Sequence, residues 1–316
     1  MGLMDNVFVL HRDLVNYTYH HGGYQVFNIC DPKPRRIHKA SVRDRLLHHA
    51  IYRKLYPFFD RIFIYDSYSC RLNKGTHRAV NRFRNLFYQI SQNNTKTCWV
   101  LKCDIQKFFA SINHSILKNI LSEYIPDKKI LGLLGEVINS FETKENTGLP
   151  LGNLTSQILV NIYMNKFDQF IKHKLKVRYY LRYADDFVLM SDNHDWLAKQ
   201  IPLIDRFLKN ELALKLHPDK IIIKTYASGV DYLGWVSFTD HRILRTTTKR
   251  RILKRMALNP RNESINSYFG LIKHGNTNKL KKEILGLIFN PLYYAREKQD
   301  SCYFGADGER KDRMGN

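Results

Sequence analysis

Three aspartates lie in sequence patterns that could bind divalent metal ions. Asp104 ends a short apolar run, and Asp185 and Asp186 lie between two apolar segments within residues 179–190. A carboxylate at a strand end, beside a carboxylate pair at a hairpin tip, offers the oxygen ligands that Mg²⁺ prefers. Two such ions, roughly 3.5–4 Å apart, support phosphoryl transfer. The pattern therefore predicts this chemistry, provided that the two strands are adjacent.

Each acid taken alone has a plainer explanation. A lone aspartate at a strand end is usually solvated, and acidic pairs are common in turns. The flanking residues favour the metal site, because Leu101 and Phe108 on one side and Phe187 on the other predict buried sheet. Acids gathered in buried sheet repel one another unless a cation lies between them.

The positioning elements are predicted from periodicity. Residues 99–104 form an expected buried strand, and residues 179–190 form two strands joined as a hairpin. Helices are expected at about 156–175 and 196–212, and further strands at 221–226 and 232–238. The middle of the chain is therefore predicted to be α+β, an antiparallel sheet with helices on one face.

The chain of 316 residues exceeds the usual size of a single core, so two or three lobes are expected. A polar stretch at 91–96 puts one boundary near residue 95. The segment 31–54 predicts a basic, part-helical lobe, and 241–256, with seven Lys and Arg and no acid, predicts a basic helical one. The tail from Tyr303 has little apolar surface to bury, and we expect it to be frayed.

The charge of the chain indicates its partner. Lys and Arg number 51 against 29 Asp and Glu, a formal net charge of +22 that is spread over several segments. Such a surface attracts a polyanion, and nucleic acid fits better than an anionic membrane. A ribosomal type of RNA-binding protein would have a similar balance, so charge indicates the partner and not the reaction.

Cysteine, histidine and hydropathy patterns argue against other classes of protein. No CxxC pair is present, which favours reduced thiols and no structural zinc, and no apolar run could cross a bilayer. We expect a soluble, cytoplasmic protein without a membrane partner. Adjacent histidines point apart on a helix or strand, so no metal site is expected at either pair. The cysteines are Cys30, Cys70, Cys98, Cys103 and Cys302, and the pairs are His20-His21 and His48-His49.

Five motifs, in chain order, resemble the palm motifs of reverse transcriptases. They are LKCDIQKFFASI (101–112), GLPLGNLTSQ (148–157), YADD (183–186), LHPDK (216–220) and DYLGW (231–235). YADD alone would be a weak signal, whereas five motifs in register are a strong one. The resemblance implies an RNA-directed DNA polymerase with a right-hand fold. Its expected parts are fingers at 1–95 with part of 113–147, a palm at 96–238, a helical thumb at 239–300 and a flexible tail at 301–316.

Within that family, the chain is most similar to the enzymes of diversity-generating retroelements, which are related to group II intron reverse transcriptases. Leu154-Thr155-Ser156-Gln157 ends in Ser-Gln where most relatives have Ser-Pro, and residues 63–77 and 267–277 also resemble this group. The resemblance implies a bacterial, archaeal or phage-encoded enzyme that copies a template-repeat RNA into adenine-mutagenised cDNA. Its partners would be an RNA template, a DNA or RNA primer, deoxynucleotides, structured template RNA and a small basic accessory protein oligomer.

Two alternatives are kept. A stand-alone reverse transcriptase of a defence system or retron would share the palm motifs, although the Ser-Gln ending argues against it. A non-catalytic RNA-binding scaffold would share the fold, although the complete set of three acids argues against it.

The resemblance assigns the metal ligands and the residues around the reacting groups. Asp104 and Asp185 would be the principal ligands of two Mg²⁺ ions, with Asp186 in support and the Ile105 carbonyl as a further ligand. Lys220 would protonate the leaving pyrophosphate, and a surface lysine is its plainer alternative. The primer grip would be Tyr232, Leu233 and Gly234, where glycine allows close backbone approach.

The remaining assignments concern the incoming nucleotide. Phe109 matches the steric gate that rejects a ribose 2′ hydroxyl, with a core aromatic as the alternative. Leu151 lies where accurate relatives often have glutamine, which predicts errors opposite template adenine, and simple packing is the alternative. The full predicted deoxynucleotide site is Arg35, Arg36, Lys39, Arg43, Phe109, Leu151, Gly152 and Gln157; a solvated basic face remains the alternative for at least two of the four cations.

Overall fold

The computed structural model describes residues 2–30 and 34–289 and divides into two compact units, 1–225 and 226–316. The predicted tail at 301–316, the last part of the predicted thumb at 290–300, and Cys302 lie outside the described residues. The division falls within the predicted palm at 96–238. The fingers, palm and thumb boundaries stay predictions.

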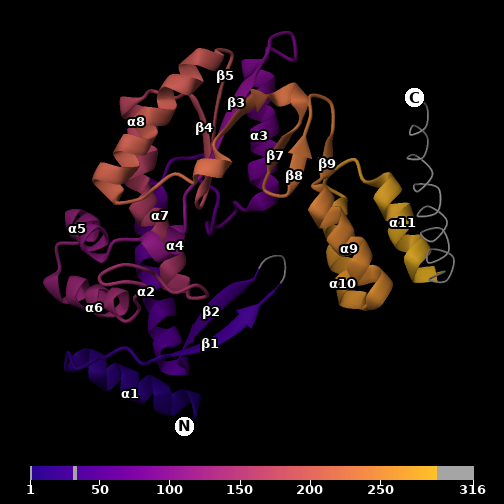
Figure 1. The fold of residues 1–316 in the computed structure, drawn as a ribbon. Coiled ribbons are helices and arrows are strands. Elements are labelled where there is room, and N and C mark those ends of the chain that lie inside the picture. Colours follow the sequence, from indigo (N-terminus) through magenta and orange to yellow (C-terminus); the bar gives the residue numbers. More distant parts are fainter. Residues whose placement is uncertain (1, 31–33, 290–316) are drawn as a thin grey trace, which may run out of the picture. The chain divides into compact units, whose positions relative to one another are not determined.

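The first unit is a helical body built around a small antiparallel sheet (Figure 1). Its helices are α1 (Leu3–Val15), α2 (Val42–Ile62), α3 (Thr76–Ile90), α4 (Phe108–Ser111), α5 (His114–Tyr124), α6 (Lys128–Asn139), α7 (Leu154–Gln169) and α8 (His194–Leu212), with a π-helical turn η1 (Phe170–Lys174) and a 3-10 turn η2 (Pro218–Lys220). Its strands are β1 (Tyr24–Ile29), β2 (Arg35–Ala40), β3 (Trp99–Asp104), β4 (Tyr179–Tyr183), β5 (Asp186–Ser191) and β6 (Ile222–Thr225).

The central sheet has the strand order β4-β5-β3-β6, and all three pairings are antiparallel. Alternate residues such as Leu101 and Phe187 join the main core with α7 and α8. The other set, including Val100 and Val188, is buried as well. The sheet is therefore covered on both faces, and α3, which contacts β4 and β5, contributes to that cover. The prediction of helices on one face alone was too narrow.

The hairpin of β1 and β2 was not predicted from the sequence, which indicated a part-helical lobe for this region. Tyr24 pairs with Ala40 at one end and Ile29 with Arg35 at the other. The hairpin is largely exposed on both faces, so its sequence lacks the period-2 alternation that marks a half-buried strand. The helix expected after it is confirmed as α2.

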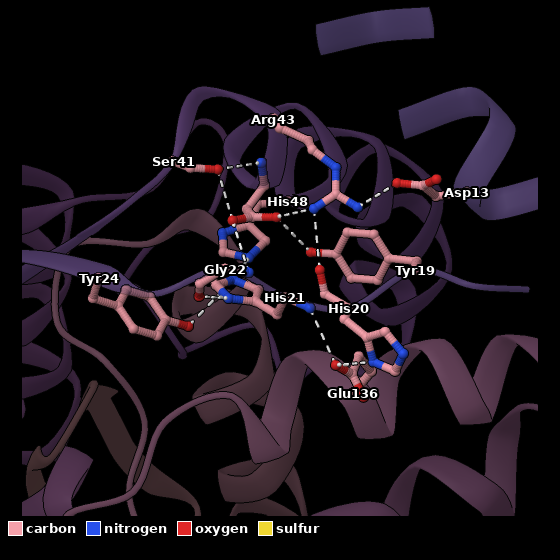
Figure 2. A network of polar contacts seen from close by, with 11 residues as sticks. Asp13, Tyr19, His20, His21, Gly22, Tyr24, Ser41, Arg43, His48 and Glu136 are labelled. Carbon is pink, nitrogen blue, oxygen red and sulfur yellow. Dashed lines mark hydrogen bonds and ion pairs between the residues drawn. The ribbon is translucent and has the colours of Figure 1, made fainter. Parts of the chain in front are cut away.

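A buried carboxylate anchors the start of this hairpin to α2 (Figure 2). Asp44, which is fully buried, accepts hydrogen bonds from the Tyr19 hydroxyl at 2.9 Å and from the Gly22 amide at 3.1 Å. Burial opposes ionisation of Asp44, but hydrogen bonds from Ser41 and Tyr19 keep its pKa below the usual value. The charge of Asp44 therefore holds the segment that leads into β1.

His21 and His48, one from each pair of adjacent histidines, contact each other beside Asp44. The Nε2 atoms of His21 and His48 lie 3.1 Å apart, so one ring donates to the other. His48 is 1% exposed, and burial, together with the neighbouring His21, lowers its pKa to about 4. His48 therefore stays neutral at neutral pH.

The low pKa of His48 predicts an acid-sensitive fold. The unfolded chain binds a proton on this ring near pH 6.5, whereas the folded chain binds it near pH 4. The contribution of His48 to stability is therefore complete above pH 6.5 and falls by about 3 kcal/mol as the pH drops to about 4. Urea unfolding at a series of pH values should show this loss in the wild type and not in His48→Asn. The exposed neighbour His49 supplies the control, since His49→Asn should keep the wild-type slope.

The second unit combines a three-stranded antiparallel sheet with three helices among its described residues, 226–289. Its elements are η3 (Tyr226–Ser228), β7 (Val230–Tyr232), β8 (Trp235–Ser237), β9 (Arg242–Leu244), α9 (Thr246–Leu258), α10 (Asn262–Ile272) and α11 (Asn278–Phe289). Helices were predicted here. The strand predicted at 232–238 is confirmed in part, as β8, while a hairpin turn separates β8 from β7, which ends at Tyr232.

That turn consists of Leu233 and Gly234, with φ of 51° and 86°. Both residues have positive φ, which is what a two-residue hairpin turn of this kind requires. A Cβ on Gly234 would meet nothing within 4 Å. Glycine is therefore needed here for its backbone conformation rather than for close approach within the described structure.

Within residues 2–30 and 34–289, no helix combines the length and the apolar character needed to cross a bilayer.

Candidate active site

The predicted strands of the three acids are adjacent. In the pairing of β3 with β5, Asp104 lies directly opposite Asp186. The hairpin of β4 and β5 is also confirmed, and it closes with Tyr183 opposite Asp186. Ala184 and Asp185 form its two-residue turn, with Ala184 in the left-handed region at φ 54°. Strand register therefore brings all three carboxylates to one edge of the sheet.

A loop after α8 extends along the end of β3. The Gln106 amide donates to the Lys215 carbonyl at 2.9 Å, and the His217 amide donates to the Asp104 carbonyl at 2.8 Å. This pairing places the η2 turn beside Asp104, where Lys220 Nζ donates to Asp104 Oδ1 at 2.9 Å. The predicted proton donor thus lies within the acid cluster.

Burial and mutual repulsion disfavour charge on the acid pair. Burial raises the pKa of Asp186 to about 7, opposed by Lys102 and reinforced by Asp104 and Asp185. The pKa of Asp185 is also raised, first by burial and then by Asp104, while Lys220 and Arg35 act against the shift. One oxygen of Asp186, Oδ1, is buried without a hydrogen-bond partner. Such an arrangement is typical of a site prepared for a cation.

The donor set fits magnesium in kind, since it offers carboxylate oxygens that include a buried, unpaired one. Asp104, Asp185 and Asp186 would hold the ions, and the Ile105 carbonyl is adjacent in sequence. Across residues 2–30 and 34–289, however, no three His, Cys, Asp or Glu side chains are gathered into a ready ligand set. Lysines contact two of the acids instead, Lys220 with Asp104 and Lys102 with Asp186.

A fully buried ion pair, which the sequence analysis did not predict, supports the turn that carries Asp185. Arg182 in β4 donates through Nε and Nη2 to the two carboxylate oxygens of Asp168 in α7, at 2.8 and 2.7 Å. Its Nη1 donates to the Ala184 carbonyl at 3.0 Å, and both side chains are 0% exposed. Tyr180 also donates to Asp168, at 2.7 Å. The guanidinium thereby links the hairpin turn to the core helix behind it.

The nucleotide turn, residues 148–152, which carries the predicted nucleotide contacts Leu151 and Gly152, docks on the hairpin of β1 and β2. The His38 amide in β2 donates to the Leu151 carbonyl at 2.9 Å, and Asn153 Nδ2 donates to the His38 carbonyl at 2.9 Å. Gly152 has φ 107°, and a Cβ there would lie 2.7 Å from the Ile37 side chain. Asn153, which the sequence analysis did not single out, thus fixes Leu151 and Gly152 against β2.

Three of the predicted phosphate ligands extend from β2. Arg35, Arg36 and Lys39 are exposed, and the charge of Arg35 is close enough to oppose the rise in the pKa of Asp185. Arg43 lies elsewhere. Its guanidinium donates to Asp13 at 2.7 Å and to the His20 carbonyl at 3.1 Å, contacts that favour a structural role.

Phe108 and Phe109 are neighbours in sequence but differ in burial. Phe108 is 3% exposed within the core, whereas Phe109 is half-buried and its carbonyl accepts from the Leu149 amide at 2.8 Å. This bond places Phe109 next to the 148–152 turn. Gln157 is half-buried in the first turns of α7. The steric-gate and nucleotide-contact roles remain predictions.

The predicted primer grip forms the end of β7 and the following turn in the second unit. Tyr232 is fully buried, and Leu233 and Gly234 form the turn described above. Their role against a primer stays a prediction.

Comparisons with known proteins identify the family of this chain. Residues 31–237 match the family model described as reverse transcriptase (RNA-dependent DNA polymerase). The chain is 25% identical to protein YkfC of Escherichia coli, over 69% of the chain and 65% of YkfC. It is 22% identical to the group II intron-encoded protein LtrA of Lactococcus lactis, over 69% of the chain and 46% of LtrA. The chain thus spans less than two-thirds of either relative.

Solved telomerase structures share the fold. That of apo telomerase from Candida tropicalis matches 92% of the chain and 60% of its own length, with a TM-score of 0.56 and 12% identity. That of Candida albicans telomerase with a telomeric RNA fragment matches 91% and 55%, with a TM-score of 0.53 and 13% identity. These likenesses concern the fold alone, and it is the family match over more than half of the sequence, residues 31–237, that shows that the chain belongs to the reverse transcriptase family.

Proposed function

We propose that this chain is an RNA-directed DNA polymerase that extends a primer by two-magnesium phosphoryl transfer. The observation that carries the proposal is the register of β3 against β5, which places Asp104 opposite Asp186 and beside the Asp185 turn. Family membership supports the same reaction. When bound, the two ions would activate the primer 3′ hydroxyl and neutralise charge on the triphosphate.

The residues of the chain would divide the remaining work. Asp104 and Asp185 would hold the ions, with Asp186 behind them, and Arg35, Arg36 and Lys39 on the exposed β2 strand would bind the triphosphate oxygens. Lys220, already within the cluster, would donate its Nζ proton to the leaving pyrophosphate. Phe109, beside the nucleotide turn, would exclude a 2′ hydroxyl.

We further infer that the enzyme works in a diversity-generating retroelement and miscopies template adenines. The Ser156-Gln157 ending and the aliphatic Leu151 support this inference. Leu151 offers only an apolar side chain, which has no donor or acceptor and so cannot align a base through a hydrogen bond. A structured template RNA and a basic accessory protein would be the partners of this activity.

Primer extension on an RNA template, with Mg²⁺, deoxynucleotides and sequencing of the products, tests both the polymerase activity and the errors opposite adenine. Misincorporation opposite adenine should exceed that opposite the other bases in the wild type. Leu151→Gln should reduce the adenine errors about tenfold, which is the discrimination that one hydrogen bond supplies. Leu151→Met, which stays apolar, should keep the wild-type error pattern.

The outcomes separate the proposals. Accurate copying by the wild type would retain the polymerase and reject adenine mutagenesis. No product, even with a candidate accessory protein and template RNA, would favour a non-catalytic scaffold.

A further inference from the structure

Lys102 lies within the acid cluster without any assigned role. It precedes Asp104 by two residues on β3, and alternate residues of a strand share one face. Its Nζ lies 3.4 Å from Asp186 Oδ2, and both side chains are largely shielded, at 18% and 19% exposure. The geometry of β3 therefore directs the Lys102 ammonium toward Asp186, the residue that pairs with Asp104.

The two lysines of the site differ in how freely they can move. Lys220 lies in a 3-10 turn, and its side chain is 43% exposed. Lys102 is fixed to the middle of the sheet, between β5 and β6, and can move only at its side chain. A lysine on such a fixed backbone is better suited to stay beside Asp186 as its counter-charge than to enter and leave the site with substrate.

The acids need such a counter-charge when no ion is bound. Three carboxylates lie at one sheet edge, and like charges at short range in a shielded site destabilise the fold. An ammonium beside Asp186 offsets this repulsion. A divalent ion bound to Asp186 would supply positive charge in place of the ammonium, and it would repel the ammonium.

We propose that Lys102 is a positioning residue that substitutes for a divalent cation at Asp186 in the metal-free enzyme and is displaced when the ion binds. The ion must then compete with Lys102, so Lys102 weakens metal binding while it stabilises the empty site. This inference rests on the proposed metal-dependent function. It assigns Lys102 no contact with substrate.

The test is Lys102→Met in the full chain, with Mn²⁺ binding measured through the spin-resonance signal of the free ion. Removal of the competing ammonium should tighten Mn²⁺ binding about tenfold. Thermal unfolding with a chelator should show a lower midpoint than the wild type, and saturating Mn²⁺ should narrow that difference. Both effects should vanish in an Asp186→Asn background, because the partner charge is absent there.

Lys224→Met is the matched control. Lys224 is half-buried on β6 opposite Val100, so it shares the sheet face of Lys102 while lying further from the acids along the strands. It should leave Mn²⁺ affinity unchanged.

Unchanged or weaker Mn²⁺ binding by Lys102→Met would overturn the proposal while leaving the metal site intact. Absence of Mn²⁺ binding by the wild type would instead reject the metal-dependent function, and the role of Lys102 with it.

Discussion

Asp185→Asn is expected to reduce primer extension at least about 10³-fold. The substitution removes a carboxylate that would hold the catalytic ions, and loss of several kcal/mol of transition-state stabilisation corresponds to a rate loss of this size. Single-turnover extension with a pre-bound RNA template and primer measures the effect on the chemical step. Saturating deoxynucleotide keeps substrate binding from masking it.

The fold should survive this change, which separates loss of chemistry from loss of structure. Burial and Asp104 raise the pKa of Asp185, so a neutral amide relieves repulsion in the metal-free state. The unfolding midpoint in chelator should therefore equal or exceed that of the wild type. Asp192→Asn, an exposed acid just beyond β5, should retain full activity. Residual extension above a tenth of the wild-type rate in Asp185→Asn would remove Asp185 from the metal site.

Arg182→Met should destabilise the protein by about 3–5 kcal/mol, because it leaves the carboxylate of Asp168 buried without its cation. The same change removes the donor to the Ala184 carbonyl, so the turn that carries Asp185 loses its tie to the core. Urea unfolding followed by circular dichroism measures the first effect. Polymerase activity below the unfolding transition measures the second.

The double variant Arg182→Met with Asp168→Leu tests whether the unpaired charge of Asp168 causes the loss of stability. If the cost arises from an uncompensated charge, removal of both partners should recover much of the lost stability. Arg178→Met, at an exposed arginine just before β4, should change stability by no more than about 0.5 kcal/mol. A double variant no more stable than Arg182→Met alone would place the cost in packing and hydrogen bonds rather than in charge.

Local sequence patterns were sufficient to predict the strands that carry the three acids. Apolar runs on both sides of Asp104 and of the pair Asp185-Asp186 identified the strands, and the hairpin needed only two turn residues between them. The adjacency of β3 and β5 was a condition of the prediction, and the register now meets it. The period-2 alternation of β3 would also have placed Lys102 beside Asp104, had it been applied to charged positions.

Contacts between distant segments could not be predicted in this way. Arg182 lies in an apolar strand, and nothing near it in sequence marks Asp168 on the preceding helix as its partner. The exposed β1 and β2 hairpin has no buried face to impose a pattern. The sequence analysis placed Arg43 in the nucleotide site together with Arg35, and only the fold directs it to Asp13.

The docking of the nucleotide turn on β2 also bears on how fidelity and affinity can evolve. His38 donates its amide to Leu151 and accepts at its carbonyl from Asn153, so one residue of β2 holds the nucleotide turn in place. The same strand carries Arg35 and Arg36, the proposed phosphate ligands. A substitution that shifts this strand would therefore alter substrate capture and copying accuracy together, and selection on either property would act on both.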